Sequence, residues 1–164
     1  MADEEWTPWL NRHGPAMLLL ARQWANDASE AEDIVQEAFL RFWRLREKAA
    51  DRAAYLYACV RSVATELRRG GTRRAAREKR VARPERVVDW FTAAPERAER
   101  DARIERLLRG LPEAQREVVV MKIWGRLSFE QVAIALGTSP NTAASRYRYA
   151  LEKLRAELAE EHVP

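Results

Sequence analysis

The sequence predicts an all-α protein made of two small helical domains joined by a basic, flexible linker. Apolar residues recur at helical spacing along almost the whole chain, and no short stretch alternates strictly enough to be a strand. Between the two helical halves, residues 71–97 combine glycine, proline and arginine, a composition typical of a linker. The 164 residues suffice for two domains with modest cores. We therefore assign residues 1–70 and 98–164 to the two domains.

Three helices are predicted in the first half, over about residues 6–26, 30–48 and 52–69. The second is the best defined, because Ser29 and Glu32 have the spacing of a capping box at its start. Apolar residues at three- and four-residue intervals form a stripe along this helix: Ala31, Ile34, Val35, Ala38, Phe39, Phe42 and Trp43. This stripe is the face that the second helix is expected to bury.

Four more helices are predicted in the second half, and glycine or proline separates most of them. The first two run over about residues 98–109 and 112–124. Ser128 and Gln131 form a capping box for the third helix, which stops at Gly137.

The fourth of these helices begins after Ser139, a preferred N-cap residue, with Pro140 in the first turn where its missing amide hydrogen costs nothing. A short helix, a glycine-containing turn and a helix with polar early turns are typical of a helix-turn-helix motif. The apolar faces of its two helices are expected at Phe129, Val132, Ala133 and Leu136, and at Ala143, Tyr147, Ala150, Leu151 and Leu154.

The remaining face of the last helix is polar and carries Asn141, Thr142, Ser145, Arg146 and Tyr149. Such side chains can donate to phosphates, and Asn and Arg can also bind base edges in the major groove. The motif therefore predicts DNA binding. An ordinary helical hairpin with a solvated face is the alternative on this spacing alone.

The positive charge of the chain lies in its middle. Residues 68–86 hold nine Arg or Lys against two Glu, whereas residues 87–164 hold twelve of each sign. A basic run of this kind suits a polyanionic partner such as nucleic acid. A solvated basic tail is the alternative.

Few residues suit catalysis, metal binding or a disulfide. Cys59 stands alone in an apolar stretch and is expected to be a buried hydrophobe, while His13 is expected at the surface. The sequence contains no phosphate loop or cluster of metal ligands, so we expect no catalytic residue, metal or cofactor. The apolar run at residues 16–21 is too short to cross a membrane, and we expect a cytoplasmic protein with no membrane segment.

Two segments resemble a known family. LPEAQREVVVMKIWGRLSFEQVAIALGTSPNTAASRYRYALEKLR, residues 111–155, resembles the last conserved region of the extracytoplasmic-function sigma factors, the small two-domain branch of the major bacterial sigma family. SEAEDIVQEAFLRFW, residues 29–43, resembles the helix with which that family binds core RNA polymerase. The resemblance implies that the chain binds core RNA polymerase and directs it to promoters.

The resemblance places the polymerase contacts on the second helix. Matched by motif position, they are Asp33, Gln36, Glu37, Phe39, Leu40 and Trp43. The polar members and Leu40 fall at three- and four-residue intervals and share one helix face. For the polar side chains the alternative is a solvated surface, and for Phe39 and Trp43 it is core packing.

The third helix resembles the segment that binds and opens the upstream edge of the minus-ten promoter element. The corresponding residues are Tyr55, Tyr57, Arg61, Ser62, Arg68 and Arg69. An aromatic ring would stack on an unpaired base and the arginines would hold the backbone, although either tyrosine could instead belong to the core. The family commonly has Trp, Asn and Asp where this chain has Tyr55, Ser62 and Glu66.

The helix after Pro140 corresponds to the one that enters the major groove at the minus-thirty-five element. The expected contacts are Ser139, Asn141, Thr142, Ser145, Arg146 and Tyr149. Family members often have Val-Lys where this chain has Ala143 and Ala144, so one phosphate contact is missing. Each DNA-binding domain is then expected to bind weakly alone and to gain affinity when both are held on one polymerase.

The implied partners are core RNA polymerase and promoter DNA, and an anti-sigma factor is a further partner that many family members have. The alternative from another class is a stand-alone DNA-binding regulator that uses the same helix-turn-helix. That alternative leaves the 29–43 segment unexplained.

Overall fold

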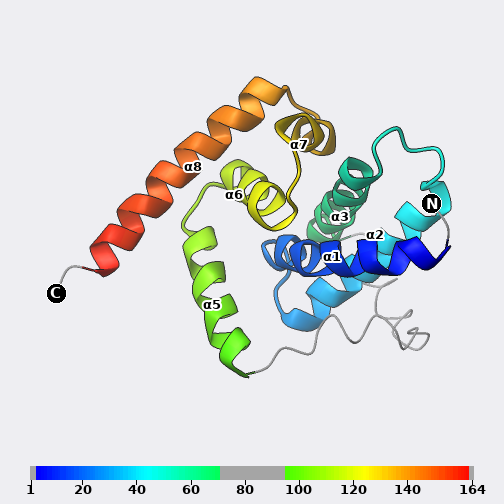
Figure 1. The fold of residues 1–164 in the computed structure, drawn as a ribbon. Helices are drawn as coiled ribbons and strands as arrows, with labels where there is room; N and C mark the ends of the chain where they lie inside the picture. Colours follow the sequence, from blue (N-terminus) through cyan, green and yellow to red (C-terminus); the bar gives the residue numbers. More distant parts are fainter. Residues whose placement is uncertain (1–2, 71–94, 163–164) are drawn as a thin grey trace.

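The computed structural model describes residues 3–70 and 95–162, and every regular element in these two ranges is helical. Figure 1 shows the arrangement. The elements are α1 (Asp3–Arg22), α2 (Ala28–Leu45), α3 (Arg52–Arg68), α5 (Pro95–Arg109), α6 (Glu113–Val119), η3 (Val120–Trp124), α7 (Phe129–Leu136) and α8 (Pro140–Glu161). The all-α prediction is confirmed. The segment 71–94, with most of the basic run, lies outside the described residues.

Helices α1 to α3 pack around a shared apolar core. The largest side chains that are completely or almost completely buried there include Tyr57, Phe42, Met17, Leu20 and Ile34. The predicted stripe of α2 faces this core, except that Phe39 and Trp43 at its edge are only half-buried. Cys59 is buried, as expected.

The start of α2 differs from the prediction. Asp27, not Ser29, is the N-cap: its Oδ1 accepts a hydrogen bond from the Glu30 amide at 2.7 Å. Glu30 in turn accepts from the amide of Asn26 at 2.6 Å. Asp27 with Glu30 and Ser29 with Glu32 are both suitable capping pairs, and the chain uses the earlier pair. The predicted Ser29–Glu32 capping box is therefore wrong.

The second half follows the predicted boundaries closely, with one irregularity. The helix after Pro112 ends in a π-helical turn, η3, and the Gly125 amide donates to the Val120 carbonyl at 3.0 Å. At Gly125 a β-carbon would lie 2.6 Å from the Met121 carbonyl oxygen and 2.9 Å from the Tyr57 hydroxyl oxygen. Only glycine allows the backbone to come this close.

The helix-turn-helix forms as predicted from α7 and α8. Ser128 and Gln131 make the expected capping box, and Gly137 ends α7 with a φ of 65°, a left-handed conformation that favours glycine. The rings of Phe129 and Tyr147 meet at a centroid distance of 5.6 Å and join the two helices.

The two halves of the described chain pack against each other. Helix α3 lies against α7, and α1 lies against η3; Figure 1 shows α8 on the outer side of this assembly, with the C-terminus at its far end. The buried apolar residues of both halves form one continuous cluster, from Trp6 to Ala150. The domain boundaries themselves stay a prediction.

The observed N-cap predicts a selective effect on stability. Asp27→Ala should lower the free energy of unfolding by about 1 kcal/mol, because the first turn of α2 loses its side-chain acceptor. Ser29→Ala is the matched control, because Ser29 lies inside the helix and should cost less than about half as much. Urea titrations of both variants measure the difference, and equal losses would contradict the cap assignment.

Candidate nucleic-acid and polymerase interface

Some of the predicted DNA contacts are exposed on the outward face of α8, and others are half-buried. Asn141 in the first turn is exposed, and so is Tyr149, at 53%. Ser145 is half-buried. The helix-turn-helix therefore offers a polar first turn and an aromatic side chain two turns later on its free surface.

Ser139 and Thr142 serve first to build the start of α8. Ser139 Oγ accepts from the Thr142 amide at 3.1 Å, and the two hydroxyl oxygens are 2.9 Å apart. This arrangement fixes the first turn, in which Pro140 has no amide hydrogen and the amides of Thr142 and Ala143 are bonded to Ser139, so that only the Asn141 amide is left over as a donor.

Arg146 lies close to a buried carboxylate. It is half-buried, and its charge acts on Glu117 of α6, which is only 3% exposed. Burial raises the pKa of Glu117, and the positive charges of Arg61 and Arg146 partly oppose that rise. Arg146 therefore takes part in the packing of the second half as well as being a predicted DNA contact.

The predicted polymerase face lies along α2 beside its buried stripe. Asp33, Gln36 and Glu37 are half-buried, and Leu40 is 43% exposed. Glu37 accepts a hydrogen bond from Arg41 Nε at 3.3 Å. These four side chains share a continuous surface that a partner could cover.

Phe39 and Trp43 support this face from the side. Their ring centroids are 5.7 Å apart, and Trp43 also lies 5.4 Å from the ring of Trp6. The guanidinium of Arg46 sits 3.6 Å from the centroid of the Trp43 ring. Trp43 is thus mainly a packing residue of the first half.

Glu66, one of the departures from the family pattern, connects α3 with α2. Arg41 of α2 donates to both carboxylate oxygens of Glu66 on α3, at 2.7 and 2.6 Å. The bidentate pair lowers the pKa of Glu66, mainly through its hydrogen bonds to Arg41. It fixes α2 and α3 relative to each other.

Of the two predicted base-stacking tyrosines, the structure makes only Tyr55 partly accessible. Tyr57 is fully buried, and its hydroxyl shares a hydrogen bond of 2.9 Å with Nδ1 of His13. Tyr55 is half-buried and packs on Phe42 at a centroid distance of 5.9 Å. In this arrangement Tyr57 is a core residue, and its stacking on a base stays a prediction.

His13 is also placed differently from the prediction. It is 6% exposed rather than at the surface, and the Trp9 ring lies 4.6 Å from its own. Burial, with a smaller contribution from Arg12, lowers the pKa of His13 to about 4. One feature of the sequence is consistent with this burial, because His13 lies between apolar residues at helical spacing in α1.

Two of the three predicted minus-ten arginines pair with acidic residues of the second half. Arg61 Nε donates to Glu117 Oε1 at 3.0 Å, and Arg68 donates to Glu113 Oε2 at 2.7 Å. Ser62 and Arg69 are exposed. Sequence reasoning missed Glu113 and Glu117, because nothing in the sequence indicates that α6 would lie beside α3.

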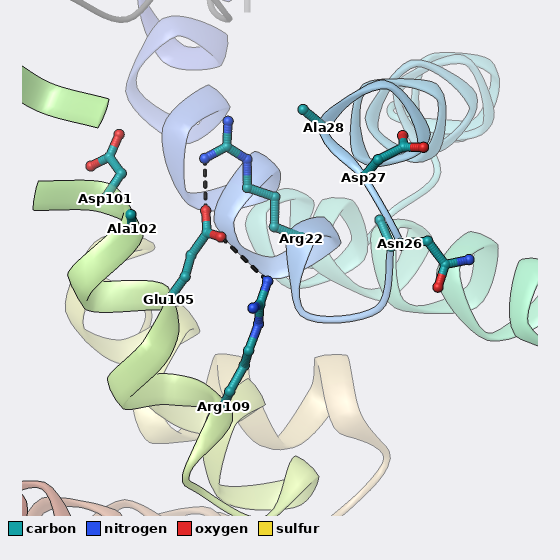
Figure 2. Close-up of a pocket in the computed structure, with 9 residues that line it drawn as sticks. Arg22, Asn26, Asp27, Ala28, Asp101, Ala102, Glu105 and Arg109 are labelled. Carbon is teal, nitrogen blue, oxygen red and sulfur yellow. Dashed lines mark hydrogen bonds and ion pairs between the residues drawn. The ribbon is translucent and has the colours of Figure 1, made fainter. Parts of the chain in front are cut away.

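A shallow pocket lies where the end of α1 meets α5. Figure 2 shows Arg22 and Arg109 both directed at Glu105, with nitrogen–oxygen distances of 2.7 and 3.7 Å. Asp27 and Asp101 also line the pocket, so its acidic side chains outnumber the two arginines, and the pocket is a junction between the halves rather than a site for an anion.

Within the described ranges, no three His, Cys, Asp or Glu side chains are grouped so that they could bind a metal ion. None of the described helices is long and apolar enough to span a membrane.

Comparisons with known proteins match both halves. Residues 9–74 match the family model for Sigma-70 region 2, and residues 101–154 match that for Sigma-70, region 4. The chain is 32% identical over 157 residues to an RNA polymerase sigma-E factor of Streptomyces coelicolor, covering 94% of this chain and 86% of the relative. It is 30% identical to the ECF RNA polymerase sigma factor SigL of Mycobacterium tuberculosis, with 92% and 86% covered.

Two solved structures have a similar fold. The sigma factor RpoE of Bartonella quintana, in complex with the anti-sigma factor NepR, has a TM-score of 0.66 at 19% identity, covering 95% of this chain and 98% of that one. CnrH in complex with the cytosolic domain of CnrY has a TM-score of 0.65 at 23% identity, covering 97% and 90%.

The buried His13 predicts a pH-dependent stability. Its pKa is lowered on folding, so the unfolded chain binds a proton that the folded chain does not as the pH falls from about 6.5 toward 4. Over this range the wild type should lose up to about 1 kcal/mol per pH unit more than His13→Gln. Urea titrations at several pH values measure this difference, and parallel profiles for the two proteins would contradict it.

Proposed function

The chain belongs to the extracytoplasmic-function sigma factors of the sigma-70 family, and we propose from the placement of its residues how it binds core RNA polymerase and directs it to promoters. The observation that carries the proposal is that one chain contains both matched regions, region 2 and region 4. A stand-alone DNA-binding regulator would need only the second.

The polymerase docks on α2. Its outer face combines the carboxylates of Asp33 and Glu37, the amide of Gln36 and the exposed side chain of Leu40. Such a mixture suits a partner surface with positive charge around an apolar centre. The Trp43 and Phe39 rings beneath it, and the Arg41–Glu66 pair, hold the helix rigidly in place.

Promoter recognition is divided between the halves. The first turn of α8, with Asn141 exposed and Ser139 capping the helix, enters the major groove at the minus-thirty-five element. The exposed side of α3, with Tyr55, Ser62 and Arg69, faces the minus-ten element. The polymerase supplies the catalysis, and this chain selects the promoter at which transcription begins.

The expected partners indicate the cellular compartment in which the chain acts. Because core RNA polymerase and promoter DNA are cytoplasmic in bacteria, the chain acts in the cytoplasm. The similar sigma factor RpoE binds an anti-sigma factor, and a protein of that class is a candidate partner here as well.

Reversing one charge on α2 should separate polymerase binding from folding. Asp33→Arg should weaken association with core polymerase at least about tenfold, because it places a like charge in the docking face. Size-exclusion co-elution with bacterial core polymerase measures this. Glu160→Arg, with the same charge change at an exposed site near the end of α8, is the control and should co-elute like the wild type.

If wild type and both variants all co-elute, the docking face lies elsewhere. If none co-elutes, although each is folded by circular dichroism, polymerase binding itself is refuted and the stand-alone regulator becomes the better description.

Removing a base contact in α8 should lower promoter-directed transcription and leave polymerase binding unchanged. Asn141→Ala should weaken promoter recognition by about 1–3 kcal/mol, and so lower promoter-directed transcription roughly 5- to 150-fold, by removing a bidentate group from the exposed first turn. Co-elution with polymerase should not change. Run-off transcription from a cognate promoter measures the effect, and full activity of the variant would remove Asn141 from the interface.

A further inference from the structure

Arg126 is the one non-glycine residue of the described ranges whose backbone is left-handed, with a φ of 55°. A residue with a β-carbon adopts this conformation at a cost in free energy that glycine avoids. Where α7 ends in the same conformation, the chain uses glycine, at Gly137 with a φ of 65°. Non-glycine residues held in such conformations cluster at functional sites.

The turn that contains Arg126, residues 125–128 between η3 and α7, is held firmly by its other residues. The Leu127 amide donates to the Met121 carbonyl at 3.1 Å, and Lys122 Nζ donates to the Leu127 carbonyl at 3.2 Å. The Leu127 side chain is buried. The neighbours of Arg126 therefore impose its backbone conformation, and the turn cannot relax the strain.

The side chain of Arg126 is exposed, although the residues on either side of it in the chain are buried. Among the described residues it forms no ion pair with a carboxylate. Its charge is therefore available to an anionic partner. Because the turn is already rigid, binding through this side chain costs less conformational entropy than binding through a mobile loop.

The place of Arg126 in the helix-turn-helix indicates which anion it meets. In this motif the first helix, here α7, crosses the DNA backbone while the second enters the major groove, and in three-helix versions the loop before the first of these helices also contacts the backbone. The 125–128 turn is that loop in this chain. Phe129 at the start of α7 packs on Tyr147 of α8, so the turn is fixed relative to the helix that enters the groove.

We propose that Arg126 is a phosphate contact of the helix-turn-helix, held ready by a rigid turn for the DNA backbone beside the minus-thirty-five element. The proposal rests on the proposed function for the identity of that element, but a phosphate contact does not depend on base sequence. Arg126 fixes the register of α8 on the duplex and adds affinity without reading bases. It offsets the phosphate contact that the chain lacks at Ala144.

Salt dependence of DNA binding by the full-length protein tests the contact, with a fluorescent duplex of arbitrary sequence as the probe. Arg126→Gln should lower the slope of log affinity against log salt by about 0.9, the value for one phosphate. Arg126→Lys keeps the charge and should keep the wild-type slope. Arg155→Gln, an equal change of charge at an exposed position in the second half of α8, is the control and should also keep it.

Three results would overturn the proposal, given native circular dichroism for each variant. One is a wild-type slope for Arg126→Gln. Another is an equal decrease for Arg155→Gln, because the effect would then come from net charge. The third is a decrease for Arg126→Lys as large as that for Arg126→Gln, because the charge would then not be what binds.

Arg126→Gly separates the contact from the strain. Glycine adopts a φ of 55° freely, so this variant should unfold at a higher urea concentration than Arg126→Gln, while its salt slope falls by the same amount. A lower urea midpoint for Arg126→Gly than for Arg126→Gln would show that the backbone at this position is not strained. That result would overturn the premise of the proposal.

Co-elution with core polymerase distinguishes DNA from the polymerase as the partner. Arg126→Gln should co-elute like the wild type, whereas loss of co-elution with a wild-type salt slope would assign Arg126 to the polymerase and overturn the proposal. Failure of the wild type itself to co-elute would refute the proposed function instead. The salt slope measured without polymerase would still decide whether Arg126 contacts phosphates.

Discussion

The buried carboxylate of Glu117 is the constraint on which the arrangement of the two halves depends. At 3% exposure it needs positive charge beside it, and it receives this from Arg61 of α3 and from Arg146 of α8. One residue of α6 therefore sets the position of both helices that carry predicted DNA contacts. The continuous apolar cluster brings the halves together, and this carboxylate fixes how they meet.

The first half is built to act as one rigid piece. Arg41 and Glu66 bind α2 to α3 through two parallel hydrogen bonds, and elsewhere on α2 the Trp43 ring meets Trp6 edge-on and carries the Arg46 guanidinium on its face. The polymerase face and the minus-ten face thus lie on adjoining helices that cannot move independently. Docking on one positions the other, which is what a factor that couples polymerase to DNA requires.

The sequence could predict what depends on local spacing. The capping box of Ser128 and Gln131, the N-cap at Ser139 and the left-handed Gly137 each involve neighbours a few residues apart, and each formed as predicted. Where two local solutions compete, spacing alone does not decide, and at α2 the chain uses Asp27 instead of Ser29.

The sequence could not predict what depends on contact between distant segments. The burial of His13 follows from Tyr57, 44 positions away, and the pairing of Arg61 follows from Glu117, 56 positions away. In the sequence, both residues look like ordinary polar positions of a helix. His13 receives its partner from the packing of α1 against α3, and Arg61 receives its partner from the packing of α3 against the second half. Helical periodicity contains no information about either contact.

The Arg61–Glu117 pair specifies how the halves meet more than it stabilises their contact. Removing Arg61 alone is costly because the buried charge of Glu117 is left without this partner, whereas Arg61, whose side chain is 39% exposed, stays partly hydrated in either case. Separating the halves is different, since both ions then return to water together and recover their hydration. The pair can therefore specify one closed arrangement strongly while adding little to the free energy of opening. Most of that free energy must come from the apolar contacts, such as those around Tyr57 and Gly125.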